Sequence, residues 1–317
     1  MEWLWWTLGA LGALAVLVLL VAFYCYMRVF YSPGRKPLGD GEYEIPDGEE
    51  YIPYREAIIG WVKAAREMPH EDVEITSRDG LTLRGKYYEY EAGAPVEILF
   101  HGYQGNGERD MSAGIERCFA LGRSALIVDH RASGRSDGHT ITFGIRERLD
   151  CVDWARFAAE KFGSERRLII TGISMGGATV TMAAADPDLP PSVVCALADC
   201  PYSSAREIIM KVIGQMHLPP RLVYPFVRLG ALLFGRFDPD EYSPREGARA
   251  ARIPIIYIHG GADGFVPHEM SLTLHSLTAT KSAICIIDGA AHGLAFPTDK
   301  EKYLAALADF QTEFLTV

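Results

Sequence analysis

Short runs of consecutive apolar residues alternate with longer stretches of helical periodicity along most of the chain. Each short run has the length and composition of a buried strand, whereas the longer stretches repeat apolar residues every three to four positions. The predicted strands lie at 73–75, 81–90, 96–100, 125–129, 168–172, 193–198, 253–259 and 283–287. The predicted helices lie at 53–67, 111–121, 145–162, 176–185, 268–277 and 301–314. This alternation predicts an α/β fold with a mainly parallel, eight-stranded sheet covered by helices on both faces.

The first two predicted strands differ from the others because they flank the tight turn Arg78-Asp79-Gly80, which favours an antiparallel pair. The connection between the sixth and seventh strands is also unusual, because it is long and contains two helical patterns, at 205–216 and 222–234. Long excursions within compact folds are often lids or binding elements. The pattern predicts a small helical cap at about 203–250.

The first thirty residues have a third pattern. No charged residue lies between Glu2 and Arg28, and most of residues 8–23 are Leu, Val, Ala or Gly. About 20 such residues cross a bilayer core of roughly 30 Å. Aromatic residues typical of membrane interfaces flank this run: Trp3, Trp5 and Trp6 before it, and Tyr24, Tyr26 and Tyr31 after it. A transmembrane anchor at 1–31 is predicted.

A cleaved signal peptide is the alternative for this segment. It requires a basic start and small residues at a cleavage site, but Glu2 is the one early charge and the run ends in Tyr, Cys, Tyr, Met, Arg. These features favour a retained anchor. Arg28, Arg35 and Lys36 follow the run and no Lys or Arg precedes it, which predicts a cytoplasmic catalytic domain.

Composition narrows the remaining possibilities. The chain has 317 residues, which suits one large domain or two ordinary ones. Its net charge of −10 argues against binding to nucleic acid, which requires clustered Lys and Arg. Apart from Cys25, the cysteines are odd in number and lack framework or CxxC spacing, as expected for reduced thiols without a metal. We divide the chain into the anchor, a linker with a leading helix at 32–70, and one catalytic domain at 71–317.

The segment Gly172-Ile173-Ser174-Met175-Gly176 follows a predicted buried strand and precedes a helix of small residues. This is the G-x-S-x-G pattern in the context of a nucleophile elbow, where glycines permit a sharp turn that presents the serine hydroxyl. The helix N-terminus behind it favours developing negative charge. An ordinary Gly-rich turn is the alternative, but the strand and helix on either side favour Ser174 as the nucleophile.

A serine nucleophile requires a base that is held by a carboxylate. Asp263 follows the seventh predicted strand, and His292 lies on a Gly- and Ala-rich loop after the last one, in the order Ser, acid, His. We therefore predict Asp263 as the acid and His292 as the base. Asp199, directly after the sixth strand, is the reserve acid if Asp263 only forms a turn.

Acyl transfer also needs hydrogen-bond donors for the developing oxyanion. The backbone N–H of Met175, directly after the nucleophile, is one predicted donor. The loop after the third strand reads His101-Gly102-Tyr103-Gln104-Gly105, and the Tyr103 N–H is the second. The Tyr103 side chain could instead only pack over the loop.

The chain resembles the α/β-hydrolase superfamily over about residues 73–314. The motifs that carry the resemblance lie at 101–106, 129–138, 172–177, 260–267 and 289–293. The resemblance is greatest to bacterial hydrolases grouped with serine aminopeptidase-like and lysophospholipase-like members. Ala132 departs from the glycine that many relatives have after the arginine. Ser174 argues against dehalogenase or epoxide hydrolase activity, for which relatives carry Asp. No dinucleotide fingerprint is present, so we expect a hydrolase without a cofactor or metal.

The resemblance implies an acyl hydrolase, but its motifs specify the fold and triad and not the substrate. We predict cleavage of carboxylic esters, and the membrane anchor makes small or lipid-like esters reasonable substrates. Apolar cap residues could line an acyl tunnel or face the membrane, or could simply pack against the body. Four cap cations could bind anionic headgroups or could simply be solvated on helix surfaces: Arg206, Lys211, Arg221 and Arg228. A serine aminopeptidase, amidase or thioesterase is the alternative, with Glu207 or Glu241 as the site for a free amine. A non-catalytic membrane adaptor is a third possibility, which an intact Ser174, Asp263 and His292 disfavours.

Overall fold

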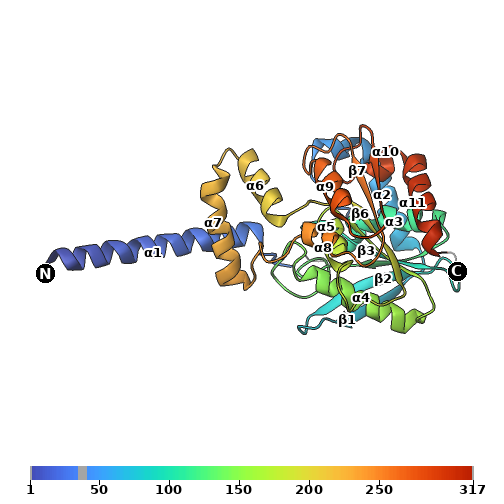
Figure 1. The fold of residues 1–317 in the computed structure, drawn as a ribbon, viewed down its shortest axis with the longest axis horizontal. Coiled ribbons are helices and arrows are strands. Elements are labelled where there is room, and N and C mark those ends of the chain that lie inside the picture. The colour runs from blue at the N-terminus through green and yellow to red at the C-terminus, as the bar shows by residue number, and fades with distance from the viewer. Residues whose placement is uncertain (1, 35–40, 316–317) are drawn as a thin grey trace.

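The computed structural model describes residues 2–34 and 41–315. A single sheet of eight strands in the order β1-β2-β4-β3-β5-β6-β7-β8 forms its centre (Figure 1). The strands are β1 (Glu71–Thr76), β2 (Thr82–Tyr88), β3 (Val96–Phe100), β4 (Ser124–Val128), β5 (Leu168–Ile173), β6 (Val193–Asp199), β7 (Ile255–Gly260) and β8 (Ser282–Ile287). Only the β1–β2 and β2–β4 pairs of this sheet are antiparallel. The predicted mainly parallel sheet, with its antiparallel pair at the start, is therefore confirmed.

Helices cover both faces of the sheet. They are α2 (Arg55–Glu67), α3 (Gly107–Ala120), α4 (Glu147–Phe162), α5 (Met175–Ala183), α8 (Pro244–Arg249), α9 (Glu269–Leu277), α10 (Ala295–Thr298) and α11 (Lys300–Leu315), with a 3-10 turn η1 at Glu49–Tyr54. One face of the central strands presents Ile98, Phe100 and Leu126 to α4 and α5. The other presents Leu99 and Ile127 to α2 and α3. This alternation explains why these strands read as continuous apolar runs.

The cap lies between β6 and β7, as predicted, and consists mainly of α6 (Ala205–Gln215), α7 (Pro220–Gly230) and a π-helical turn η2 (Ala231–Gly235). Pro220 occupies the first turn of α7, where a missing N–H costs nothing. The inner side of the cap joins a second apolar cluster with Tyr224, Val227 and Ala231.

The first helix, α1 (Glu2–Val29), is the one helix in the described ranges that is long and apolar enough to cross a membrane. A signal sequence near an N-terminus shares this property. Figure 1 shows α1 projecting from the body, with α6 and α7 gathered around its C-terminal end. Arg35 and Lys36, part of the charge pattern that predicts orientation, lie outside the described residues.

The last turns of α1 are part of the protein interior. Ala22, Tyr26 and Phe30 are buried. The Phe30 ring packs edge-on against Phe143 and Phe237, with centroids 5.7 and 5.1 Å away. The end of the predicted anchor is thus packed against the cap and the body.

Candidate active site

Ser174 lies at the turn between β5 and α5, with φ 55° and ψ −112°. A non-glycine residue rarely adopts a positive φ, and such strain is typical of functional turns. Its N–H donates to the Asp199 carbonyl oxygen at 2.8 Å, which holds the strained turn against the end of β6. The predicted sharp strand-to-helix turn is present.

The glycines of this motif are required by close backbone packing. A Cβ at Gly172 would lie 2.1 Å from the Gly176 carbonyl. A Cβ at Gly176 would lie 2.1 Å from the Phe100 oxygen on β3. Contacts this short would force the backbone to move, so larger residues would shift Ser174.

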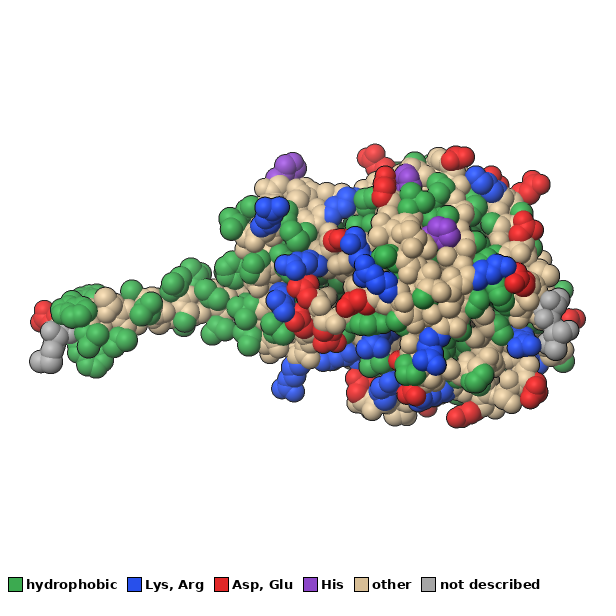
Figure 2. All heavy atoms as spheres, in the orientation of Figure 1, with side chains coloured by type: hydrophobic (Ala, Val, Ile, Leu, Met, Phe, Trp, Pro, Cys, Tyr) green, Lys and Arg blue, Asp and Glu red, His purple; other side chains and the backbone are tan. Residues whose placement is uncertain are grey.

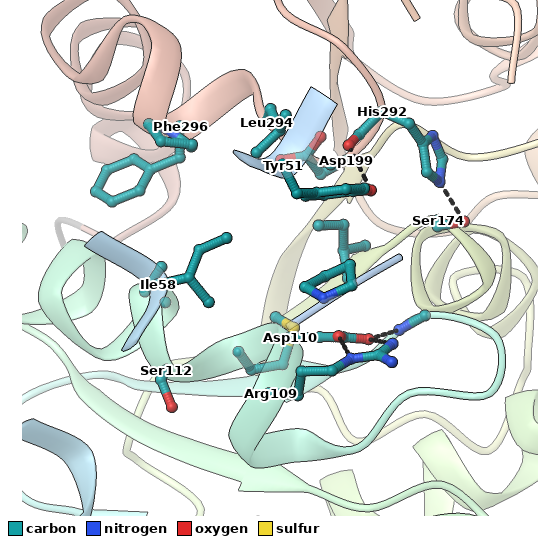
Figure 3. Close-up of a pocket in the computed structure, with 18 of the residues that line it drawn as sticks. Tyr51, Ile58, Arg109, Asp110, Ser112, Ser174, Asp199, His292, Leu294 and Phe296 are labelled. Carbon is teal, nitrogen blue, oxygen red and sulfur yellow. Dashed lines mark hydrogen bonds and ion pairs between the residues drawn. The ribbon is translucent and has the colours of Figure 1, made fainter. Parts of the chain in front are cut away.

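His292 lies on the loop after β8 and faces the Ser174 hydroxyl (Figure 3). Its Nε2 is 3.0 Å from Ser174 Oγ, and its Nδ1 is 2.7 Å from Asp263 Oδ2. Because an ionised carboxylate can only accept, Nδ1 carries the proton and Nε2 accepts from the serine hydroxyl. This is the tautomer that a general base requires.

Asp263 lies on the turn after β7 and is almost fully buried. Its Oδ1 accepts hydrogen bonds from the N–H groups of Phe265 and Val266, at 2.9 and 2.8 Å. Burial opposes ionisation, but hydrogen bonds from His259 and His292 hold the pKa of Asp263 well below its usual range. Asp263 is therefore ionised, and its carboxylate accepts the hydrogen bond that orients His292.

His259 forms a hydrogen bond with Asp263 that the sequence did not reveal. Its Nε2 is 3.1 Å from Asp263 Oδ2 and 2.9 Å from the Val266 oxygen. Its Nδ1 is 2.6 Å from Ser271 Oγ. Because the Val266 carbonyl can only accept, Nε2 of His259 carries a proton and stabilises the charge on Asp263.

Asp199, the reserve acid, has a different partner. Its Oδ2 accepts from the Tyr303 hydroxyl at 2.8 Å. Burial raises the pKa of Asp199, although the bond from Tyr303 acts in the opposite direction. The structure thus brings Asp263 to His292 and directs the Asp199 carboxyl to Tyr303.

The loop predicted to supply the second oxyanion donor runs beside Ser174. A Cβ at Gly102 would be 3.7 Å from the Ser174 Cβ. The Gly102 N–H donates to Asp110 Oδ2 at 3.0 Å, which holds the start of this loop beside the nucleophile. Burial opposes ionisation of Asp110, but the charge and hydrogen bonds of Arg109 lower its pKa and keep it an acceptor.

The Tyr103 side chain connects this loop to α1. Its hydroxyl donates to the Val29 oxygen at 2.7 Å, and its ring lies 4.9 Å from that of Phe143. Burial raises the pKa of Tyr103 to about 12. The side chain therefore packs as the alternative reading expected, and it also ties the loop to the end of the first helix.

A cavity of about 480 Å³ opens beside Ser174. Figure 3 shows Ser174 and His292 on one side of it and Ile58 and Phe296 on the other. Its apolar lining comes mainly from η1, α2, α3 and the region of α10: Tyr51, Ile58, Trp61, Met111, Ala113, Leu294, Phe296 and Pro297. Its polar lining includes Asp47, Glu50, Arg109, Asp110 and Asp199.

The cap lies away from this cavity, which bears on two of the alternatives that the sequence left open. Within the described part of the chain, no residue of 203–250 lines this cavity, so the cap does not form its acyl lining. Glu207 and Glu241 are also not among the lining residues, and Glu207 pairs with Arg245 at 2.9 Å. Instead, the segment before β1, expected to be a linker and leading helix, covers the cavity.

Most of the cap cations have partners within the protein. Arg206 pairs with Asp240 at 3.7 Å, and Arg228 pairs with Asp238 at 2.6 Å. Lys211 donates to two carbonyl oxygens of the loop after Asp263, each at 2.6 Å. Lys211 therefore ties α6 to the loop that carries the acid.

Tyr51 is the clearest contribution that sequence reasoning missed. It lies in η1, and its hydroxyl donates to the His292 carbonyl oxygen at 2.8 Å. These two residues are 241 positions apart. No local pattern connects them, so only the tertiary structure reveals that Tyr51 supports the His292 loop.

One group of possible metal ligands is present in the described residues, formed by Cys200, Asp263 and His292 within 4.8 Å. Burial raises the pKa of the Cys200 thiol well above its ordinary value, whereas metal ligation requires a thiolate. Both ring nitrogens of His292 are already hydrogen-bonded. The donor set fits a proton relay better than an ion.

The chain is similar in sequence to known α/β-hydrolases and to a bacterial protein. A family model described as alpha/beta hydrolase fold matches residues 95–233. The YqkD protein of Bacillus subtilis is 24% identical over 243 residues, covering 74% of this chain and 77% of YqkD.

Two solved esterases share the architecture at low sequence identity. The Pyrococcus furiosus esterase Pf2001 has a TM-score of 0.67 at 19% identity, covering 91% of this chain and all of that chain. Est1E of Butyrivibrio proteoclasticus, with ferulic acid bound, has a TM-score of 0.58 at 20% identity, covering 77% and 99%. These matches confirm the predicted α/β-hydrolase fold, and an esterase is among the structural neighbours.

Proposed function

We propose that the protein is a membrane-anchored serine hydrolase that cleaves carboxylic esters. The observation that carries this proposal is the chain of hydrogen bonds from Ser174 through His292 to Asp263 at the wall of an apolar cavity. An ester substrate suits this arrangement because the cavity can hold an acyl chain while its carbonyl lies at the serine. Small or lipid-like acyl esters are the proposed substrates.

The proposed reaction has two steps. Ser174 Oγ attacks the acyl carbonyl carbon while its proton passes to His292 Nε2, and Asp263 stabilises the imidazolium. His292 then gives that proton to the leaving alcohol oxygen, so the C–O bond breaks and an acyl-enzyme remains. Water, deprotonated by His292, attacks the acyl-enzyme. His292 then returns this proton to Ser174 Oγ as the acyl C–O bond breaks and the acid leaves. The N–H groups of Met175 and Tyr103 would stabilise the oxyanion in both steps.

The retained anchor is part of this proposal. Cleavage after the apolar run, which ends at Arg28, would remove Cys25 and Tyr26, which are buried against the cap and the body. Such a loss would expose apolar surface, so the packing supports an α1 that stays with the mature protein. The exposed Arg28 at its C-terminal end supports a cytoplasmic body.

The acid assignment predicts a contrast between two isosteric substitutions. Asp263→Asn should lower kcat about 10³- to 10⁴-fold, because an amide can stabilise the wrong His292 tautomer and carries no charge. Asp199→Asn should cost far less, since an amide oxygen can still accept from Tyr303. Steady-state kinetics with a p-nitrophenyl ester measures both variants, and equal losses would contradict the assignment.

The cavity predicts a dependence on acyl-chain length. Each added CH₂ that becomes buried should raise kcat/KM about fourfold, corresponding to ~0.8 kcal/mol, until the cavity is filled. A series of p-nitrophenyl esters of increasing chain length measures this trend. Ala113→Phe, which places a large side chain in the lining, should abolish the gain for longer chains while short esters still react.

Aminopeptidase activity is the second candidate, because Asp47 and Glu50 line the cavity and could bind a free amine. Aminoacyl-naphthylamides tested beside the esters separate the two activities. Turnover confined to the amides would overturn the ester proposal.

A further inference from the structure

The exposed part of α1 matches the thickness of a bilayer core. From Glu2 to Val21 its side chains are exposed, apart from a half-buried Val18. These 20 residues span about 30 Å at 1.5 Å per residue, the thickness of the hydrocarbon region. Ala22 is the first fully buried residue of the helix. Protein contacts therefore begin where a bilayer crossed by residues 2–21 would end.

The cap makes the first of these contacts. A Cβ at Gly230 of α7 would lie 2.3 Å from the Ala22 oxygen, so the two helix backbones touch directly. The Phe234 ring of η2 lies 5.1 Å from Phe23 and 5.9 Å from Tyr26. Figure 1 shows α7 lying across α1 rather than along it. A helix placed this way beside a spanning helix runs along the membrane surface.

The outer side of the cap is apolar although nothing in the described structure covers it. Large apolar side chains are exposed along α7, along η2 and on the turn before α7: Met216, Leu218, Leu222, Leu232, Leu233 and Phe234. Leu222 is 68% exposed. In Figure 2 apolar atoms continue from α1 onto the adjoining cap. We call these six residues the cap apolar face.

Basic side chains accompany this face. Arg221 lies in the first turn of α7 beside Leu222, Arg236 follows η2, and Arg28 lies near the end of α1. All three are exposed. Arginine beside an exposed apolar helix face is the pattern of helices that lie in the headgroup region of a membrane. Each cation near an anionic surface adds attraction.

We propose that the cap apolar face is seated in the lipid bilayer that α1 crosses, so that α7 and η2 form a second, interfacial membrane contact. The proposal rests on α1 being a membrane span. Seating this face removes apolar surface from water, and α1 holds it at the right depth through the Ala22–Gly230 contact. The cap then adds a second membrane contact beside α1, which fixes the rotation of the catalytic body relative to the membrane surface.

Spin labels on the full chain in phosphatidylcholine–phosphatidylglycerol vesicles test this contact. Leu222→Cys and Leu233→Cys are labelled in a Cys285→Ser background, because Cys285 is the half-buried cysteine and the other five are buried. Each label is exposed in turn to oxygen, which concentrates in lipid, and to a water-soluble nickel chelate. The ratio of oxygen to nickel accessibility should be several-fold higher at 222 and 233 than at a water-exposed control.

Leu272→Cys on α9 is the matched control, because Leu272 is an exposed leucine of the body with 41% exposure, close to the 47% of Leu233. Leu11→Cys reports insertion of α1. Lipid exposure at 11 but water exposure at 222 and 233 would overturn the cap contact and leave the anchor intact. Water exposure at 11 would overturn the anchor. Shielding of 222 and 233 from both reagents would mean that protein covers the face, and would also overturn the proposal.

Discussion

Ser174→Ala is expected to abolish covalent labelling by a fluorophosphonate probe and to lower kcat for p-nitrophenyl esters by ~10⁴-fold or more. The Ser174 hydroxyl is the one that faces His292 Nε2, at 3.0 Å, and alanine removes the attacking oxygen without adding bulk. His292 and Asp263 cannot replace it, because a base without a nucleophile accelerates acyl transfer only weakly. Gel fluorescence after labelling and steady-state kinetics measure the two effects.

A matched control for this substitution is Ser203→Ala. Ser203 is also a buried serine near the end of β6, but its hydroxyl donates to Glu207 at 2.5 Å and makes no contact with His292 in the described structure. This variant should label as the wild type does. Undiminished labelling of Ser174→Ala, or no labelling of the wild type, would refute the nucleophile assignment. Absence of labelling in the wild type would favour a non-catalytic adaptor.

Removal of residues 1–31 is expected to destabilise the catalytic domain, whereas removal of residues 1–20 is not. The longer deletion removes buried Ala22, Tyr26 and Phe30, and a single buried aromatic truncated to alanine already costs about 3–5 kcal/mol. Such losses approach the whole stability of many domains, so a fall in Tm of ~10 °C or more is expected. Among the described residues, the shorter deletion removes only exposed side chains and the half-buried Val18.

Thermal unfolding in the same detergent compares the two truncated chains. Two single substitutions in the full chain give a sharper comparison, because Phe30, directly after α1, is fully buried whereas Phe23 on α1 is 45% exposed. Phe30→Ala should lower Tm and Phe23→Ala should change it much less. The Phe30→Ala enzyme should also lose activity, because Phe30 supports Phe143, which packs on Tyr103 of the proposed oxyanion loop. Equal stability of the two truncated chains would contradict this role for α1.

The sheet could be predicted because its strands are covered on both faces. A strand buried in this way is a continuous apolar run, as residues 96–100 are, and the prediction matches β3 residue for residue. The three proposed catalytic residues could be found for a related reason. Side chains at the carboxyl ends of parallel strands meet at one edge of the sheet, so short motifs after β5, β7 and β8 indicate residues that converge.

The lining of the cavity could not be predicted in this way. The apolar cap residues were candidates because they share a composition with acyl-binding sites. In the structure the cavity is covered instead by Tyr51, Ile58 and Trp61, from a segment interpreted as a linker and leading helix. Apolar periodicity predicts that one face of a helix is buried, but it does not predict which element that face packs against.

The sequence alone was sufficient for the order of strands and helices, the elbow at Ser174, the positions of Asp263 and His292 and the apolar character of α1, because each of these leaves a local pattern of neighbouring residues. Three other features depended on the folded chain: Tyr51 supporting the His292 loop, His259 supporting Asp263, and the end of α1 buried beneath the cap. The physical reason is that these contacts join surfaces formed by separate elements, whose complementarity exists only after the sheet has brought them together.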